Sequence, residues 1–201
     1  MNYAETYWLE RYATGGNSGP GSKGRLAEFK ATTMRDLVRV YHLKSIGDFG
    51  CGDGEQAALF NLGRSEYTGF DVSDLALNRA CWRCADKGFR FVNVKKYAGE
   101  LFTATLSMDV LFHLVDDVDF EQYMTLLTSA AKKYVIIYGY DSEDDPSNGF
   151  YKPQPHMRYR KFSDWMASNG WHLHDSILNP YPYNLNMAET SVCDFSVWVR
   201  A

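Results

Sequence analysis

The stretch DFGCGDG, residues 48–54, decides the fold that we expect for this chain. It begins within the short run Ser45–Phe49 and precedes residues 55–62, which can form a helix. Gly50, Gly52 and Gly54 allow a sharp turn and bring bare backbone to a ligand that a Cβ atom would obstruct. The sequence therefore predicts a strand, a ligand-binding turn and a helix, with a plain strand-to-helix turn as the alternative.

The same alternation of strands and helices continues along most of the chain. Apolar residues recur at helical spacing after Gly24, Ser73 is suited to an N-cap, and Lys87 with Gly88 forms a helix stop. Strands and helices in this rhythm are joined by right-handed crossovers into a parallel sheet covered on both faces. We therefore expect a doubly wound α/β fold, with strands at 45–49, 67–70, 89–94, 106–112, 134–140, 171–177 and 193–200 and helices at 24–42, 55–62, 74–87, 117–132 and 162–169.

Composition limits the classes of partner. The 201 residues, 45% of them apolar and 15% aromatic, suit one domain with a buried core. A net charge of −4 and a pI near 5.7 give no general attraction to polyanions, which disfavours nucleic acid as the main partner. The sequence has no apolar run of membrane-spanning length, no secretion signal and no framework of spaced cysteines. We therefore expect a cytoplasmic protein that does not enter a membrane.

Asp71 is the second local signal. It closes the expected strand YTGFD, residues 67–71, 23 positions after Asp48. An acid at the end of the second strand of such a unit is placed to accept hydrogen bonds from both ribose hydroxyls of an adenosine. Taken alone, Asp71 is more readily explained as a turn or cap residue, but together with the glycine motif it indicates nucleoside recognition.

These residues give the chain a resemblance to a known family. Residues 25–140 resemble the class I methyltransferases that use S-adenosyl-L-methionine, since Asp48 with the three glycines matches the first motif and Asp71 the ribose-binding acid. Asp109, in LSMDVLFHL, matches the position at the end of the fourth strand. The segments YWLERYATGGNSGPGSKGRLAEFK, SMDVLFHLVDD and HMRYRKFSDW resemble a subgroup of small bacterial and phage enzymes. The resemblance implies a Rossmann-like, mostly parallel seven-stranded sheet of order 3-2-1-4-5-7-6, with strand 7 antiparallel.

The resemblance also implies which residues hold the cofactor. Asn93, after the third strand, is the candidate for contacting the adenine. The glycine-rich loop 15–24 is expected to fold over the site, with a merely flexible connection as the alternative. The expected lid contains Arg11, Tyr12, Gly15, Gly16, Ser18 and Ser22. The full set of expected cofactor-binding residues is Tyr12, Gly15, Gly16, Asp48, Gly50, Cys51, Gly52, Gly54, Asp71, Val72, Asn93 and Asp109.

Methyl transfer to a hydroxyl group calls for a base, because the hydroxyl must lose a proton during attack. His113 lies four positions past Asp109, and an imidazole with a pKa of about 6.5 suits this task. A histidine that simply packs at the end of the strand is the alternative. The expected catalytic set is His113, Asp109 and His156, and the expected substrate-binding set is Arg158, Arg160 and Tyr138, although the basic segment could equally be a solvated surface.

A magnesium site is a further alternative, because Asp109 and Asp141 follow neighbouring strands and some O-methyltransferases bind Mg²⁺ there. The main prediction has no metal. It is an S-adenosyl-L-methionine-dependent methyltransferase that acts on a hydroxyl of a small molecule or carbohydrate, with tyrosines in FYKP, YNLNM and NPYPYN lining the acceptor pocket or filling a core.

Two other functions remain open. They are a nucleotide or nucleobase methyltransferase and a cofactor-binding module without turnover. We expect a single domain over residues 1–201, with a lid and helix at 1–44, a cofactor-binding core at 45–140, a substrate loop at 141–161 and a C-terminal helix and strands at 162–201.

Overall fold

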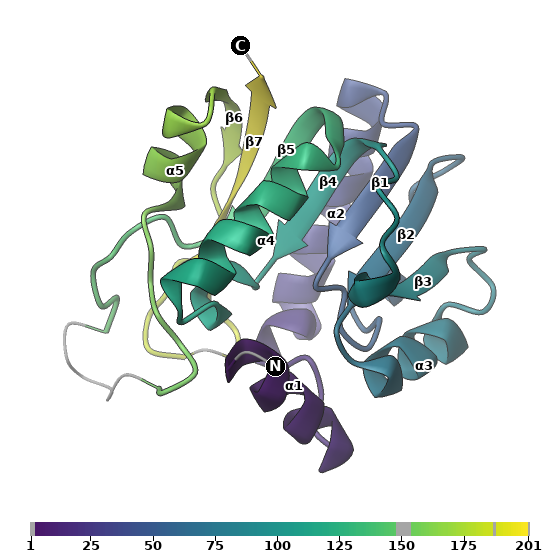
Figure 1. Ribbon diagram of the computed structural model, residues 1–201, viewed down its shortest axis with the longest axis horizontal. Coiled ribbons are helices and arrows are strands. Elements are labelled where there is room, and N and C mark those ends of the chain that lie inside the picture. The colour runs from purple at the N-terminus through teal and green to yellow at the C-terminus, as the bar shows by residue number, and fades with distance from the viewer. Residues whose placement is uncertain (1–2, 148–153, 187, 201) are drawn as a thin grey trace.

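A computed structural model describes residues 3–147, 154–186 and 188–200 (Figure 1). Its centre is a seven-stranded sheet of order β3-β2-β1-β4-β5-β7-β6. The first five strands pair in parallel, and β7 runs antiparallel to both β5 and β6. The predicted fold class and strand order are confirmed. The strands are β1 Ser45–Phe49, β2 Glu66–Asp71, β3 Arg90–Asn93, β4 Phe102–Met108, β5 Ala131–Gly139, β6 Trp171–Ile177 and β7 Asp194–Arg200.

Helices cover both faces of this sheet and its carboxyl edge. They are α1 Tyr3–Ala13, α2 Gly24–Tyr41, α3 Asp74–Arg83, α4 Asp117–Ser129 and α5 Phe162–Ser168. In Figure 1, α4 and α5 lie in front of the sheet, α2 lies behind it, and α1 lies beyond the arrowheads of β1 and β4. Among the described residues, no helix combines the length and the apolar character needed to cross a membrane.

Two apolar clusters join these layers. Behind the sheet, Met34 and Leu37 of α2 pack in one cluster with Ile46 of β1. In front of it, Phe49 of β1 joins a cluster with Met124 of α4. Because successive strand residues point to opposite faces, β1 contributes to both clusters and is almost fully buried. The hydrophobic effect of this burial holds the carboxyl end of β1, and the turn that follows it, in a fixed place.

Several boundaries differ by a few residues from those expected, as at the end of α4 and the start of β5, and two expected elements differ more. The helix expected at 55–62 is reduced to one 3₁₀ turn, η2 Ala57–Leu59, because Phe60 adopts an extended conformation and inserts into the core behind the sheet. The strand expected at 106–112 is β4, which ends at Met108 because Asp109 takes a left-handed conformation with φ 57°. Residues Leu111–His113 then form the 3₁₀ turn η4.

The expected substrate loop is described only in part. Residues 141–147 and 154–161 belong to the described ranges, whereas the FYKP tyrosine at position 151 lies outside them. Met187 of YNLNM also lies outside them. For Tyr151 the prediction of an acceptor pocket therefore rests on the sequence, whereas Tyr181 and Tyr183 lie in the described ranges and are not among the residues that line the cavity described below.

Candidate functional site

A cavity of about 330 Å³ opens at the carboxyl ends of β1, β2 and β4. Its volume falls in the range of small-molecule sites, and this edge is where parallel α/β sheets bind ligands. The cavity brings together most of the predicted cofactor residues and the predicted base: Tyr12, Asp48, Gly50, Cys51, Gly52, Asp71, Val72, Asp109 and His113 all line it. Residues far apart in the sequence thus meet at one site.

The glycine turn forms one wall through its backbone. Gly50 and Gly52 have φ values of 92° and 59°, which side-chain-bearing residues rarely adopt. The amide nitrogens of Gly50 and Cys51 donate to the carbonyl oxygen of Phe70 at 2.7 and 3.0 Å, so the turn is fixed to the end of β2. The left-handed glycine conformations and these bonds together explain why the motif needs glycine at alternate positions.

Asp71 borders the cavity beside this turn. Its Oδ2 accepts a hydrogen bond from the amide of Gly52 at 3.0 Å, and its Oδ1 accepts one from the amide of Ser73 at 2.9 Å. Burial raises the pKa of Asp71 to about 6, although the backbone bonds from Ser73 and Gly52 act to lower it. The carboxylate is therefore ionised at neutral pH, and its free lone pairs can accept hydrogen bonds from a ligand.

Asp48 lies deeper under the turn and is 2% exposed. Tyr67 donates its hydroxyl hydrogen to Oδ2 of Asp48 at 2.6 Å. Burial raises the pKa of Asp48 to about 7, against the lowering effect of this bond. Asp48 therefore takes up a proton in the folded chain at a pH where the unfolded chain has already lost it.

This pKa gives a first prediction, about stability. Between pH 4 and 7 the native state holds a proton on Asp48 that the unfolded state lacks, so Asp48 lowers the unfolding free energy as the pH rises. Asp48→Asn keeps an acceptor for Tyr67 but carries no charge, so we expect its unfolding free energy to gain about 3 kcal/mol relative to the wild type between pH 5 and pH 8. Urea unfolding at both pH values checks this, with exposed Asp86→Asn as the control. Parallel pH profiles of Asp48→Asn and the wild type would contradict it.

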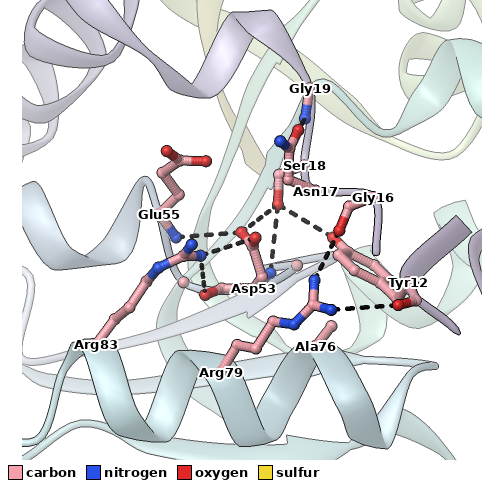
Figure 2. A network of polar contacts seen from close by, with 12 residues as sticks. Tyr12, Gly16, Asn17, Ser18, Gly19, Asp53, Glu55, Ala76, Arg79 and Arg83 are labelled. Atoms are coloured by element: carbon pink, nitrogen blue, oxygen red, sulfur yellow. Dashed lines mark hydrogen bonds and ion pairs between the residues drawn. The ribbon is translucent and has the colours of Figure 1, made fainter. Parts of the chain in front are cut away.

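The loop expected to act as a lid docks on the glycine turn through a polar network (Figure 2), and we call residues 14–23, between α1 and α2, the lid segment. The hydroxyl of Ser18 donates to Oδ1 of Asp53 at 2.6 Å and lies 3.1 Å from the hydroxyl of Tyr12. Asp53 is fully buried, and its Oδ2 lies 2.7 Å from Nη1 of Arg83. Burial acts to raise the pKa of Asp53, but the bonds from Ser18 and Arg83 outweigh it and hold the pKa below its ordinary value.

A second arginine fastens the start of the lid segment. Figure 2 shows Arg79 and Arg83 rising from α3 toward this part of the chain. Arg79 donates to the carbonyl oxygens of Gly16 at 2.6 Å and Tyr12 at 3.2 Å. Gly15 and Gly16 themselves are not among the residues that line the cavity, so their part is to shape the loop. The segment packs so closely that a Cβ on Gly52 would lie 2.5 Å from Oγ of Ser18.

His113 lines the cavity from the turn after β4. Its Nδ1 lies 3.2 Å from the carbonyl oxygen of His156. A carbonyl can only accept, so Nδ1 carries the hydrogen and Nε2 keeps its lone pair. Burial lowers the pKa of His113 to about 4, which leaves the ring neutral at physiological pH. The ring packs edge-on against Trp8 of α1, with centroids 5.0 Å apart.

A buried ion pair in the cavity was not predicted from the sequence. Lys30 is 1% exposed, and its Nζ lies 2.7 Å from Oδ2 of Asp109. The available signal was a lysine four positions from both Leu26 and Met34, on the apolar face of α2. A charge on such a face is buried only when it is paired. The negative charge of Asp109 in the cavity wall is therefore paired with the positive charge of Lys30.

This ion pair bears on the magnesium alternative, which the structure does not support. Lys30 already supplies positive charge to Asp109, and Asp141 lies away from the cavity wall, where its Oδ1 accepts from the amide of Ser163 at 2.9 Å. Within the described residues, no group of three or more His, Cys, Asp and Glu side chains is placed to hold a metal ion.

Several expected site residues lie outside the cavity wall as described. Asn93 turns away and donates to the carbonyl oxygen of Val72 at 3.1 Å and to Oδ1 of Asp74 at 2.9 Å. His156 stacks its ring on Tyr7, with centroids 4.3 Å apart. Gly54 packs against α3 instead, where an added Cβ would lie 2.7 Å from Cα of Ala80.

The expected substrate-binding residues have structural partners instead. Arg160 and Arg158 donate to the carbonyl oxygen of Val115 and pair with Asp117 at the start of α4. Tyr138 is buried beside Lys30, whose Nζ lies 5.2 Å from the ring centroid. The two arginines are thus engaged by the start of α4, and none of the three residues is among those that line the cavity.

Comparison with known proteins supports the same fold. No family model and no curated protein matches the sequence. Among solved structures, the N-methyltransferase NodS from Bradyrhizobium japonicum WM9, in complex with S-adenosylhomocysteine, is 13% identical, with 99% of each chain covered and a TM-score of 0.72. Magnesium protoporphyrin IX methyltransferase from Synechocystis PCC 6803, with bound S-adenosylhomocysteine, is 13% identical, with 99% of this chain and 97% of that chain covered and a TM-score of 0.68.

A third match is the methyltransferase domain of bacterial CtHen1, 17% identical, with 86% of this chain and 97% of that chain covered and a TM-score of 0.64. These likenesses concern the course of the backbone, since so few residues are identical. The chain therefore has the Rossmann-like α/β fold of the class I S-adenosylmethionine-dependent methyltransferases.

Proposed function

We propose that this protein is an S-adenosyl-L-methionine-dependent methyltransferase that methylates a hydroxyl group of a small molecule or carbohydrate. One observation carries the proposal: the bare backbone of the glycine turn, the ionised carboxylate of Asp71 and the neutral imidazole of His113 line a single cavity. The solved methyltransferases with this fold, two of them with bound S-adenosylhomocysteine, add support.

The residues present fit this cofactor. Asp71 offers carboxylate lone pairs to a ribose diol, and Gly50 and Gly52 present no side chain to the cavity. The wall also contains the Lys30–Asp109 pair, whose opposite charges suit the carboxylate and ammonium groups of a methionine. When bound, the cofactor supplies a methyl group on a positively charged sulfur, which a nucleophile can take by in-line attack.

The chain's own task is to exclude water and to accept a proton. Trp8 and Tyr12 of α1 and Ser18 of the lid segment cover the cavity, which keeps water from competing with the acceptor. His113 keeps Nε2 unprotonated at neutral pH, so this atom can take the hydroxyl proton. An imidazole with a pKa of about 4 is a weak base. It can still accept the hydroxyl proton, because that proton becomes far more acidic as the oxygen is alkylated.

Calorimetric titration with S-adenosyl-L-methionine and S-adenosylhomocysteine tests the proposal. Micromolar binding of both supports it and justifies a screen of sugars, small aromatic alcohols, amines and nucleosides with labelled methyl donor. Transfer to a hydroxyl confirms the acceptor class, and transfer only to a nucleobase would replace it. Absence of binding at millimolar ligand would refute the proposal.

Asp71→Ala gives the second prediction. We expect it to weaken S-adenosylhomocysteine binding by about 1–3 kcal/mol, because the ribose hydroxyls lose their acceptor. Binding by the wild type should also weaken as the pH falls through 6, where Asp71 gains a proton. Calorimetry at pH 7.5 and 5.0 measures both effects, and circular dichroism checks the fold. Unchanged affinity in a folded Asp71→Ala variant would disprove the ribose role.

A further inference from the structure

Asp119, in the first turn of α4, lines the cavity without an evident partner. Its side chain is only 9% exposed, and its Oδ2 has no hydrogen-bond partner among the described residues. Burying an unpaired carboxylate oxygen is costly, so buried oxygens of this kind normally have a partner. A donor on the ligand in this cavity would supply the missing bond.

The surroundings of Asp119 indicate which part of a ligand it meets. Close to α4 in the cavity lining are the apolar side chains Phe49, Phe70 and Leu114, which belong to the cluster in front of the sheet, and Leu126, which packs against it, while α4 itself contributes the polar side chains Asp119 and Gln122. The lining also contains the charged and hydroxyl groups of Lys30, Asp109, Ser18 and Ser22, which come from α2, the segment before it and the end of β4.

An S-adenosyl ligand likewise has an apolar part and a charged part. The faces of its adenine are apolar, whereas its methionine end carries an ammonium and a carboxylate. We therefore expect the adenine to lie against the apolar part of the wall. Val72, which also lines the cavity, follows the expected ribose-binding residue Asp71 in the chain, so the two parts of the site are adjacent.

The polar edge of the base still needs partners there. The exocyclic amino group of adenine donates, and its ring nitrogens accept. Asn93, which the sequence offered for this role, is occupied by Val72 and Asp74. Asp119 and Gln122 both line the cavity and lie three positions apart on one face of α4.

We propose that Asp119 accepts a hydrogen bond from the exocyclic amino group of adenine, and that the Gln122 amide lies beside it to complete recognition of the base edge. This inference rests on the proposed function, because it assigns a residue to the cofactor's base. It makes a residue of α4, rather than the residue that ends β3, responsible for selecting an adenine over its deaminated form.

The test compares two ligands by calorimetry, S-adenosylhomocysteine and its deaminated analogue S-inosylhomocysteine, which carries an oxo group in place of the amino group. The wild type should prefer the adenosine form by roughly tenfold or more, because the oxo group places an acceptor against the Asp119 carboxylate. In Asp119→Asn, the amide can donate to the oxo group, so the preference should fall at least tenfold or invert. The exposed Asp116→Asn, at the start of the same helix, should keep the wild-type preference.

The outcomes separate the two proposals. If the wild type binds neither ligand, the proposed function fails and this inference fails with it. If the wild type binds both ligands equally, or if Asp119→Asn weakens both by the same factor, the cofactor site stands and the role of Asp119 is overturned. An unchanged preference in a folded Asp119→Asn variant also overturns the role of Asp119, and Asp119→Ala, which removes the acceptor, is compared on the same two ligands if Asp119→Asn does not fold.

Discussion

Replacing His113 with alanine is expected to lower turnover of a hydroxyl acceptor by roughly 100-fold or more while leaving S-adenosylhomocysteine affinity nearly unchanged. The reason is geometric. The carbonyl oxygen of His156 accepts the Nδ1 hydrogen, so Nε2 is the ring nitrogen that keeps a free lone pair on a side chain that lines the cavity. Alanine removes this proton acceptor but none of the groups that face the ribose or the methionine end. Labelled methyl transfer measures turnover, and calorimetry measures affinity.

His156→Ala is the matched control, because it removes the second imidazole of the expected catalytic set but keeps the main-chain carbonyl that orients His113. We expect turnover close to that of the wild type. An amine acceptor provides a second comparison, since a free amine needs no base and should be affected far less by His113→Ala. Near-normal hydroxyl turnover in a folded His113→Ala variant would remove His113 as the base.

Replacing Asp53 with alanine is expected to release the lid segment. Asp53 accepts the Ser18 hydroxyl at 2.6 Å and pairs with Arg83 at 2.7 Å, so it is the group that joins the lid to the glycine turn and to α3 (Figure 2). A hydrogen bond to a charged group contributes about 1.5–3 kcal/mol, which corresponds to a roughly 10- to 100-fold faster opening of the segment. Amide hydrogen exchange of residues 14–19 measures this opening, and the affinity for S-adenosylhomocysteine should fall with it.

Ser18→Ala isolates the lid side of this contact, because the Asp53–Arg83 pair remains in place. It should speed exchange in residues 14–19 in the same direction as Asp53→Ala, with little change in global unfolding. Thr14→Ala is the control, since the Thr14 hydroxyl bonds only to backbone carbonyls within the preceding turn of α1. Equal exchange in all three variants and the wild type would show that the network does not hold the lid closed.

The sheet was predictable because its signals are local. The glycines at 50, 52 and 54 mark a turn that needs left-handed backbone, and the alternation of apolar strands with helices fixes right-handed crossovers. The two misplaced elements fail for a tertiary reason. Phe60 leaves the expected helix to reach the core, and the left-handed Asp109 ends β4 early. The burial of Phe60 and the left-handed backbone of Asp109 both depend on contacts with other elements, so the residue pattern of a single segment does not predict them.

The functional site likewise combines features that the local sequence predicts with features that depend on tertiary packing. By itself, the sequence determined the α/β fold, the place of the glycine turn at the end of β1 and the placement of Asp71 and His113 near it, because each follows from its position relative to a strand end. Only the tertiary structure decided that Lys30 pairs with Asp109, that Ser18 meets Asp53 across 35 positions, that Asn93 turns away and that Asp119 faces the cavity. These contacts join elements distant in the chain, and their geometry depends on how α1, α2 and α4 pack around the sheet, which no local pattern specifies.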